Sequence, residues 1–169
     1  MADEKREGKE TLFHNREIAR QLIDFSGIRV GSKIHPTDID GVIEYRNKMY
    51  ILFEIKYMDS EVPFGQRLAL ERMVEDFTKV GKDAIVFVAT HETTNVEEDI
   101  DAESCFVTEF FSGRFLRWVR VENVKITLGI AVKLFKRNPD SFLNIVGCGA
   151  NNINLLEENK EAEVVRCVS

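Results

Sequence analysis

Residues 36–57, PTDIDGVIEYRNKMYILFEIKY, carry the most informative secondary-structure pattern of this chain. Residues 38–46 and 48–57 are rich in β-branched and aromatic side chains, and a polar interruption at Arg46-Asn47-Lys48 separates them. This pattern is typical of two strands joined by a tight turn. The stretch therefore predicts a β-hairpin whose turn centres on Asn47.

Residue parity decides which charged side chains share a face of this hairpin, because side chains alternate between the two faces of a strand. Asp38 and Asp40 share one side of the first predicted strand. Glu54 and Lys56 share one side of the second. With a turn centred on Asn47, Asp40 lies opposite Glu54, and the same register places Asp38 opposite Lys56. A bulge at the turn would shift the register by one residue.

The paired carboxylates indicate a site for a divalent cation, because two close carboxylates repel each other in an apolar setting. Mg²⁺ and Mn²⁺ prefer carboxylate, carbonyl and water ligands, so the candidate ligands are Asp40, Glu54 and the backbone carbonyl of Ile55. Lys56 lies on the same face as Glu54 and is suited to hold an attacking water or to stabilise charge on a phosphoryl oxygen. The alternative is an exposed strand face that carries ordinary solvated charges.

Asp40, followed after thirteen residues by Glu54-Ile55-Lys56, resembles the signature of the PD-(D/E)XK nuclease superfamily, which includes restriction endonucleases and Holliday-junction resolvases. The resemblance implies a three-layer, restriction endonuclease-like α/β fold with an αββαβ core, a mixed central sheet and a C-terminal hairpin and helices. It also implies hydrolysis of phosphodiester bonds in DNA with Mg²⁺ or Mn²⁺, in phage or mobile-element repair, recombination or defence. In the implied site Asp40 and Glu54 bind the metal and Lys56 acts on the attacking water.

The elements around the hairpin extend the resemblance over residues 11–91. Apolar stripes predict a helix over residues 11–25 and another over residues 64–79, with Gly81 as the stop of the second. Residues 83–90 form a nearly continuous apolar run, which is typical of a strand buried on both faces. Together with the hairpin, these segments give the order of elements in the superfamily core.

Three further polar residues are candidates for the site. Gln66 falls on the apolar stripe of the second helix, where several nuclease branches carry a glutamine, so it is a candidate catalytic residue. The alternative is that Gln66 bonds to free backbone groups of the first helical turn. Asp38 is an outer or alternate metal ligand. Some relatives place a glutamate on the first helix near the metal, but Arg16 stands at the matching position here and Glu17 is one residue out of phase.

The remainder of the chain predicts two strands and two helices, at residues 105–111, 114–121, 127–137 and 141–146. The two strands are joined at Ser112-Gly113, which is a two-residue hairpin signal. Trp118 on the second of these strands packs in the core or stacks on a nucleic-acid strand together with its neighbouring arginines. Its aromatic neighbours also predict a homodimer, unless the helices from Thr127 onward cover them.

Composition and charge limit the class of protein. A chain of 169 residues with 44% hydrophobic and 31% charged residues is long enough for one sizeable core. The formal net charge of −6 argues against a large nonspecific basic surface for DNA, so local basic residues are the candidate DNA contacts. These candidates are Arg46, Lys48, Arg67, Arg72, Arg114, Arg117 and Arg120.

We expect a charged tail over residues 1–10, a single nuclease-like domain over residues 11–156, and a flexible acidic tail over residues 157–169. No apolar run approaches the roughly 18 residues that a membrane span needs, and the charged start lacks the hydrophobic segment of a signal peptide. A cytoplasmic location without a membrane partner follows. The alternative to a nuclease is a catalytically inactive nuclease-like module that binds DNA or a protein partner, although the complete set of Asp40, Glu54 and Lys56 favours the enzyme.

Overall fold

The computed structural model of this chain describes residues 28, 36–95, 98–122 and 124–147. The chain divides into two compact units, Met1–Thr37 and Asp38–Ser169, and every helix and strand described below belongs to the second unit. The predicted helix over residues 11–25 lies outside the described residues. So do Arg16, Glu17 and the two predicted tails.

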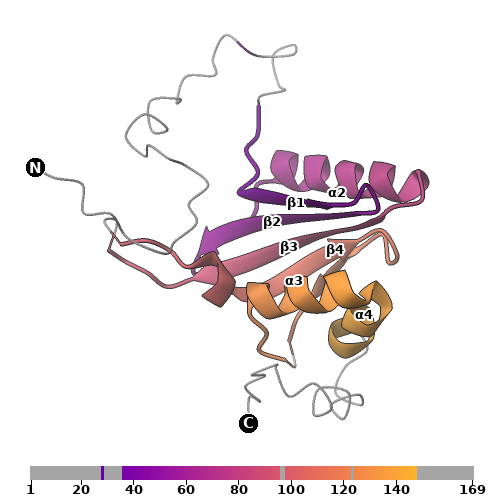
Figure 1. Cartoon of the computed structure of the whole chain (residues 1–169). Helices are drawn as coiled ribbons and strands as arrows, with labels where there is room; N and C mark the ends of the chain where they lie inside the picture. Colours follow the sequence, from indigo (N-terminus) through magenta and orange to yellow (C-terminus); the bar gives the residue numbers. More distant parts are fainter. Residues whose placement is uncertain (1–27, 29–35, 96–97, 123, 148–169) are drawn as a thin grey trace, which may run out of the picture. The chain divides into compact units, whose positions relative to one another are not determined.

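A five-stranded mixed sheet forms the centre of the second unit (Figure 1). Its strands follow one another in space as they do in the chain: β1 (Gly41–Tyr45), β2 (Met49–Tyr57), β3 (Asp83–His91), β4 (Phe106–Ser112) and β5 (Trp118–Arg120). β2 and β3 are parallel, and the other neighbours are antiparallel. Helix α2 (Phe64–Lys79) connects the parallel pair, because parallel strands need a long crossover rather than a tight turn.

The β1–β2 hairpin has the register that parity predicts, with Gly41 opposite Phe53. Its turn contains Arg46 and Asn47, whose φ angles are 54° and 56°. Positive φ at both central residues defines a type I′ turn, and the twist of this turn matches the right-handed twist of paired strands. Asparagine is among the residues that adopt positive φ most readily. The local chemistry of the turn therefore sets the register that brings the two halves of the hairpin together.

Strand β1 is shorter than the sequence predicts, since it begins at Gly41 instead of Asp38. Continued by two residues, the hairpin register would bring the N–H of Ile55 to the carbonyl of Ile39. Instead, the N–H of Ile55 donates to the Asp40 carboxylate oxygen Oδ2 at 2.6 Å. A side chain thus replaces the expected backbone acceptor, and the ladder ends where the candidate site begins.

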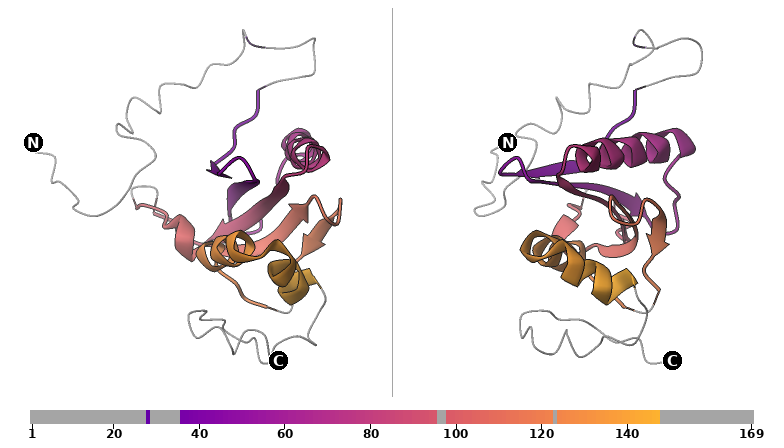
Figure 2. Two further views of the ribbon diagram at one scale, coloured as in Figure 1. Left: turned by 45° about the vertical axis from the view of Figure 1, so that its right-hand side comes forward. Right: turned by 90° about the vertical axis from the view of Figure 1, so that its right-hand side faces the viewer.

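Helices cover both faces of the sheet and give the unit three layers (Figure 2). On one face, Leu70 and Val74 of α2 pack against Leu52 and Val86 of the sheet. The other face is covered by α3 (Leu128–Arg137) and α4 (Pro139–Gly147). This arrangement of layers around a mixed sheet is the α/β architecture that the sequence predicts.

The face beneath α3 and α4 carries a core of phenylalanines. Phe142 of α4 meets Phe87 of β3 edge-on, with ring centroids 5.3 Å apart, and meets Phe110 of β4 at 5.5 Å. Phe135 of α3 completes the cluster at 6.1 Å from Phe142. Edge-to-face pairs at such distances add to the free energy of burying apolar area. Helix α4 thus covers Phe110, whereas Phe106 on the same strand is 37% exposed, so the homodimer stays a prediction.

The predicted helices agree with the structure at most of their ends. Helix α2 spans the predicted residues and stops before Gly81, which has a φ of 79° as a helix C-terminus requires. Helix α3 begins after Thr127, whose hydroxyl accepts a hydrogen bond from the N–H of Ile130 at 3.4 Å. Helix α4 begins at Pro139 and is longer than predicted, because proline is well suited to the first helical position.

The predicted two-residue turn at Ser112-Gly113 is wrong. Strand β5 begins only at Trp118, opposite Phe111, and a longer loop connects it to β4. The carbonyl of Ser112 accepts hydrogen bonds from the N–H groups of Phe115 at 3.1 Å and Leu116 at 2.9 Å. Leu116 takes a φ of 50°, a conformation that leucine rarely adopts and that its identity does not signal.

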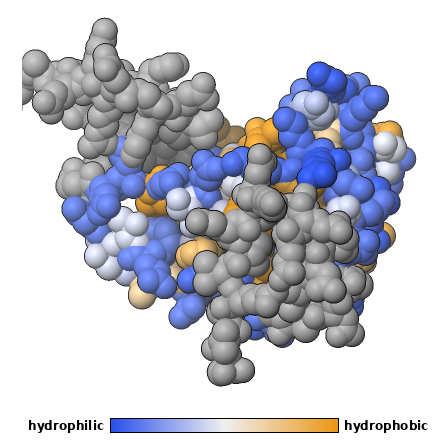
Figure 3. Space-filling view, turned by 60° about the horizontal axis from the view of Figure 1, so that its bottom comes forward, coloured by the Kyte–Doolittle hydropathy of each residue, from blue (hydrophilic) through white to orange (hydrophobic). Residues whose placement is uncertain are grey.

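The described surface is mostly hydrophilic on the side shown in Figure 3, and hydrophobic residues appear there in smaller patches. Among the described residues, no helix combines the length and the apolar character that crossing a membrane requires.

Candidate active site

Glu54 lies at the centre of the candidate site. It projects from β2 toward the α2 layer, and the residue is only 1% exposed. Its carboxylate oxygen Oε1 accepts a hydrogen bond from the ammonium group of Lys56 at 2.6 Å. Its second oxygen, Oε2, is buried and has no hydrogen-bond partner among the described residues. Since a buried acceptor without a partner costs free energy, Oε2 is available for a ligand.

Asp40 supplies the second carboxylate. It stands just before β1, and its bond to the N–H of Ile55 fixes one carboxylate oxygen against the edge of β2. The N–H and the carbonyl of a strand residue point to the same side of the strand, so the Ile55 carbonyl faces the same edge as Asp40. The hairpin thus presents two carboxylates and one carbonyl, the oxygen groups that the sequence predicts as metal ligands.

Gly41 allows the backbone to approach closely next to Asp40. A Cβ atom at this position would lie 2.1 Å from the ring of Phe53, its partner across the hairpin. Any larger residue would therefore displace either the ring or the backbone that carries Asp40. The glycine that follows the aspartate thus leaves room for the ring of Phe53 against the backbone.

Burial raises the pKa of the Glu54 carboxyl. The hydrogen bond from Lys56 acts in the opposite direction, and the negative charge of Asp40 raises the pKa further. Glu54 therefore holds its proton more tightly than a free glutamate does, although Lys56 and Gln66 both oppose this shift of its pKa. A divalent cation beside Oε2 would reverse this preference, because a bound cation is the largest local charge in such a site.

Gln66 links the two strands of the hairpin through its amide. The residue is 5% exposed, and its Nε2 donates to the backbone carbonyl of Asp38 at 3.0 Å and to the Asp38 side chain at 3.4 Å. Its Oε1 accepts from the ammonium group of Lys56 at 3.5 Å. The amide of Gln66 therefore bonds to Lys56 and Asp38, and not to free backbone groups in the first turn of its own helix. It holds the lysine from one side and the segment that leads to Asp40 from the other.

Every described residue that the sequence predicts for the site is part of this network: Asp38, Asp40, Glu54, Ile55, Lys56 and Gln66. The alternative of an exposed face with solvated charges does not hold for Glu54, because its side chain is buried. The roles of these residues in chemistry remain predictions.

The donor set fits a Mg²⁺ or Mn²⁺ ion. In the described ranges, no group of three or more His, Cys, Asp and Glu side chains is arranged to hold a metal. Mg²⁺, however, commonly uses only one or two carboxylates and takes its other ligands from water and substrate phosphates. Asp40, the Ile55 carbonyl and the unpaired oxygen of Glu54 meet that requirement.

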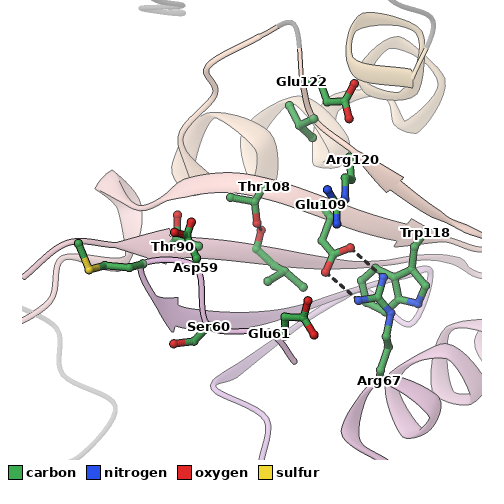
Figure 4. Close-up of a pocket in the computed structure, with 13 residues that line it drawn as sticks. Asp59, Ser60, Glu61, Arg67, Thr90, Thr108, Glu109, Trp118, Arg120 and Glu122 are labelled. Atoms are coloured by element: carbon green, nitrogen blue, oxygen red, sulfur yellow. Dashed lines mark hydrogen bonds and ion pairs between the residues drawn. The ribbon is translucent and has the colours of Figure 1, made fainter. Parts of the chain in front are cut away.

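A pocket of about 620 Å³ lies on the same face of the sheet, lined by the loop after β2 and by residues of α2, β3, β4 and β5 (Figure 4). Arg67 of α2 crosses its wall and donates to both carboxylate oxygens of Glu109, at 2.9 and 2.8 Å. The guanidinium group of Arg67 also lies 3.9 Å from the ring centre of Trp118. The sequence does not predict this cluster, because it joins a helix to strands that are distant in the chain.

Two of the predicted DNA contacts are engaged in ion pairs. Arg67 is paired with Glu109, as described above. Arg114 lies 3.1 Å from the carboxylate of Asp83 and 2.9 Å from that of Asp140. These ion pairs reduce the positive charge that either arginine offers to a phosphate.

The chain matches no protein-family model, and no curated protein or solved structure is significantly similar to it.

Proposed function

We propose that this chain is a metal-dependent nuclease that hydrolyses phosphodiester bonds in DNA with Mg²⁺ or Mn²⁺. One observation carries the proposal: the buried carboxylate of Glu54 has one oxygen on Lys56 and the other unpaired, with the charge of Asp40 close enough to raise its pKa. Such an arrangement costs stability in a purely structural role. Carboxylates whose pKa is shifted by burial and by a specific charged neighbour are typical of catalytic sites.

Asp40, Glu54 and the carbonyl of Ile55 would hold the ion. When bound, the ion supplies Lewis-acid stabilisation of the phosphate and lowers the pKa of a coordinated water. The protein contributes a fixed set of oxygens, because Asp40 is anchored to the Ile55 N–H and Glu54 is anchored to Lys56.

Lys56 would act on charge that develops at the phosphate. Its side chain is 20% exposed, and Glu54 and Gln66 hold the position of the ammonium group. A positioned cation of this kind stabilises a developing oxyanion without reorganising during the reaction. Gln66 is a positioning residue for the lysine and for the segment before β1.

The order β1, β2, α2, β3 supports the restriction endonuclease-like fold in particular. It places the carboxylates and the lysine on one hairpin and the glutamine on the following helix, as the resemblance to the PD-(D/E)XK superfamily implies. DNA is the substrate that this resemblance implies, and the negative net charge of the chain limits the phosphate contacts to local basic residues.

Cleavage of supercoiled, linear and branched DNA in the presence of Mg²⁺ or Mn²⁺ tests the proposal. We expect Asp40→Ala and Glu54→Gln each to reduce cleavage by at least about 100-fold, as loss of one group that stabilises a transition state does in other enzymes. Lys56→Ala should lose turnover while it retains DNA binding. Asp76→Asn is the matched control, because Asp76 lies near the far end of α2 and pairs with Lys79.

Cleavage at the wild-type rate by Asp40→Ala with both metals would refute the site. Absence of cleavage by the wild-type chain, with DNA binding retained, would favour the inactive binding module instead.

A further inference from the structure

The pocket beside the site shares the sheet face of the proposed catalytic residues. In the parallel register of β2 and β3, Val88 lies beside Glu54 and Thr90 lies beside Lys56. Both Val88 and Thr90 line the pocket. Neighbouring strands are about 4.8 Å apart, so the β3 wall of the pocket lies one strand away from Glu54 and Lys56, although neither residue lines the pocket.

The charges of the pocket disfavour a phosphate. Carboxylates of Asp59, Glu61, Glu109 and Glu122 line it, against the guanidinium groups of Arg67 and Arg120. The guanidinium group of Arg67 is already paired with Glu109 through two hydrogen bonds. The remaining carboxylates pair with no cation in the described part of the chain. A group that donates hydrogen bonds fits this surface better than an anion does.

Arg67 and Trp118 form a rigid stacking wall of the same pocket. The guanidinium group lies 3.9 Å from the centre of the indole ring, and both carboxylate oxygens of Glu109 hold it there. The indole N–H of Trp118 donates to Glu71, and the ring packs at 5.6 Å from Phe111. Arginine planes and tryptophan rings are surfaces on which unpaired bases stack. Because both groups are already held in place, a stacking ligand would lose little conformational entropy in ordering them.

We propose that the pocket receives an unpaired nucleobase of the DNA strand that is bound at the Asp40–Glu54 site. This inference rests on the proposed nuclease function. The base stacks on the side of the Arg67 guanidinium group that faces away from the indole ring of Trp118, and the pocket carboxylates accept hydrogen bonds from its amino groups. Cytosine and adenine present an exocyclic amino group, whereas thymine does not. The pocket volume of about 620 Å³ lies within the range of small-molecule sites, which leaves room for a nucleoside.

The test measures equilibrium binding of fluorescent octanucleotides of dC, dA and dT, and of a duplex, at one salt concentration in EDTA. Neither metal nor cleavage is needed in this assay. We expect the wild-type chain to bind dC and dA more tightly than dT or the duplex. Trp118→Leu should weaken binding of dC by about 10-fold, because Arg67 loses the ring that supports its stacking plane. Glu61→Gln should reduce the preference for dC over dT.

Glu61→Gln keeps the test decisive if Trp118→Leu fails to fold, because Glu61 is exposed at the edge of the pocket. Asp76→Asn should bind every probe as the wild-type chain does. Equal binding of dC, dT and duplex by the wild-type chain, or an unchanged preference in Glu61→Gln, would overturn the pocket assignment.

The assay also separates the two proposals. Base-selective binding without cleavage in Mn²⁺ would support the pocket and refute the nuclease. Metal-dependent cleavage with base-independent binding would support the nuclease and refute the pocket.

Discussion

The two faces of the central sheet are built from the same strands but differ in what they bury. Phe53 and Ile55 of β2 join the phenylalanine-rich core beneath α3 and α4. Glu54 and Lys56 alternate with them and point toward α2, where the apolar packing gives way to a polar network. Successive residues of one strand thus contribute to stability on one face and to the candidate site on the other.

The difference shows how the fold supports a costly group. The α2 face contains a buried carboxylate with a raised pKa and an unpaired oxygen, which destabilises the folded protein. The opposite face contains fully buried aromatic side chains that contact one another edge-on. Substitutions on the two faces should therefore separate stability from activity.

The largest change in stability is expected on the aromatic face. Phe87 is 0% exposed and meets both Phe135 and Phe142, so Phe87→Ala removes a large side chain and leaves a cavity. We expect a loss of about 3–5 kcal/mol in the free energy of unfolding, measured by urea denaturation. The control is Phe106→Ala on β4, because Phe106 is 37% exposed and should cost far less. Equal losses for the two variants would show that the aromatic face does not carry the stability.

A smaller effect of opposite sign is expected on the polar face. The pKa of Glu54 is raised above its usual value of 4.5 in the folded protein, so the folded state retains the proton more strongly than the unfolded state. The contribution of Glu54 to stability is then fully present below pH 4.5 and is lost as pH rises through the folded pKa. Glu54→Gln removes this loss and leaves an oxygen for Lys56. We expect the variant to be more stable than the wild-type chain at pH 8 in EDTA.

The denaturation midpoints of the two chains, measured in EDTA between pH 4 and pH 8, check this expectation. Their difference should shrink as pH falls toward 4.5. A wild-type chain that is more stable than Glu54→Gln at pH 8 would mean that the pair with Lys56 outweighs the cost of burial.

Local signals in the sequence predict the hairpin and α2 well. The turn at Asn47 and the alternation of apolar side chains are sufficient for the register, and an apolar stripe followed by Gly81 is sufficient for the helix. The site follows from the same parity, because the register alone brings Asp40 to Glu54. These features depend on residues that are close together in the chain, so the sequence alone predicts them.

Local sequence patterns do not predict features that depend on distant contacts or on unusual backbone conformations. The loop before β5 depends on the positive φ of Leu116, which its residue type does not indicate. The bidentate pair of Arg67 and Glu109 joins residues 42 positions apart. The early end of β1 depends on a competition in which the Asp40 carboxylate replaces a backbone carbonyl. Each of these outcomes is decided by packing in three dimensions.

Titration calorimetry with Mn²⁺ measures whether the unpaired oxygen of Glu54 takes part in binding a metal. We predict that the wild-type chain binds Mn²⁺ saturably at pH 7.5, more weakly as pH falls and Glu54 takes up its proton. Glu54→Gln should lose this binding, and Asp76→Asn should retain it. Identical Mn²⁺ binding by the wild-type chain and Glu54→Gln would show that the Glu54 carboxylate is not a metal ligand.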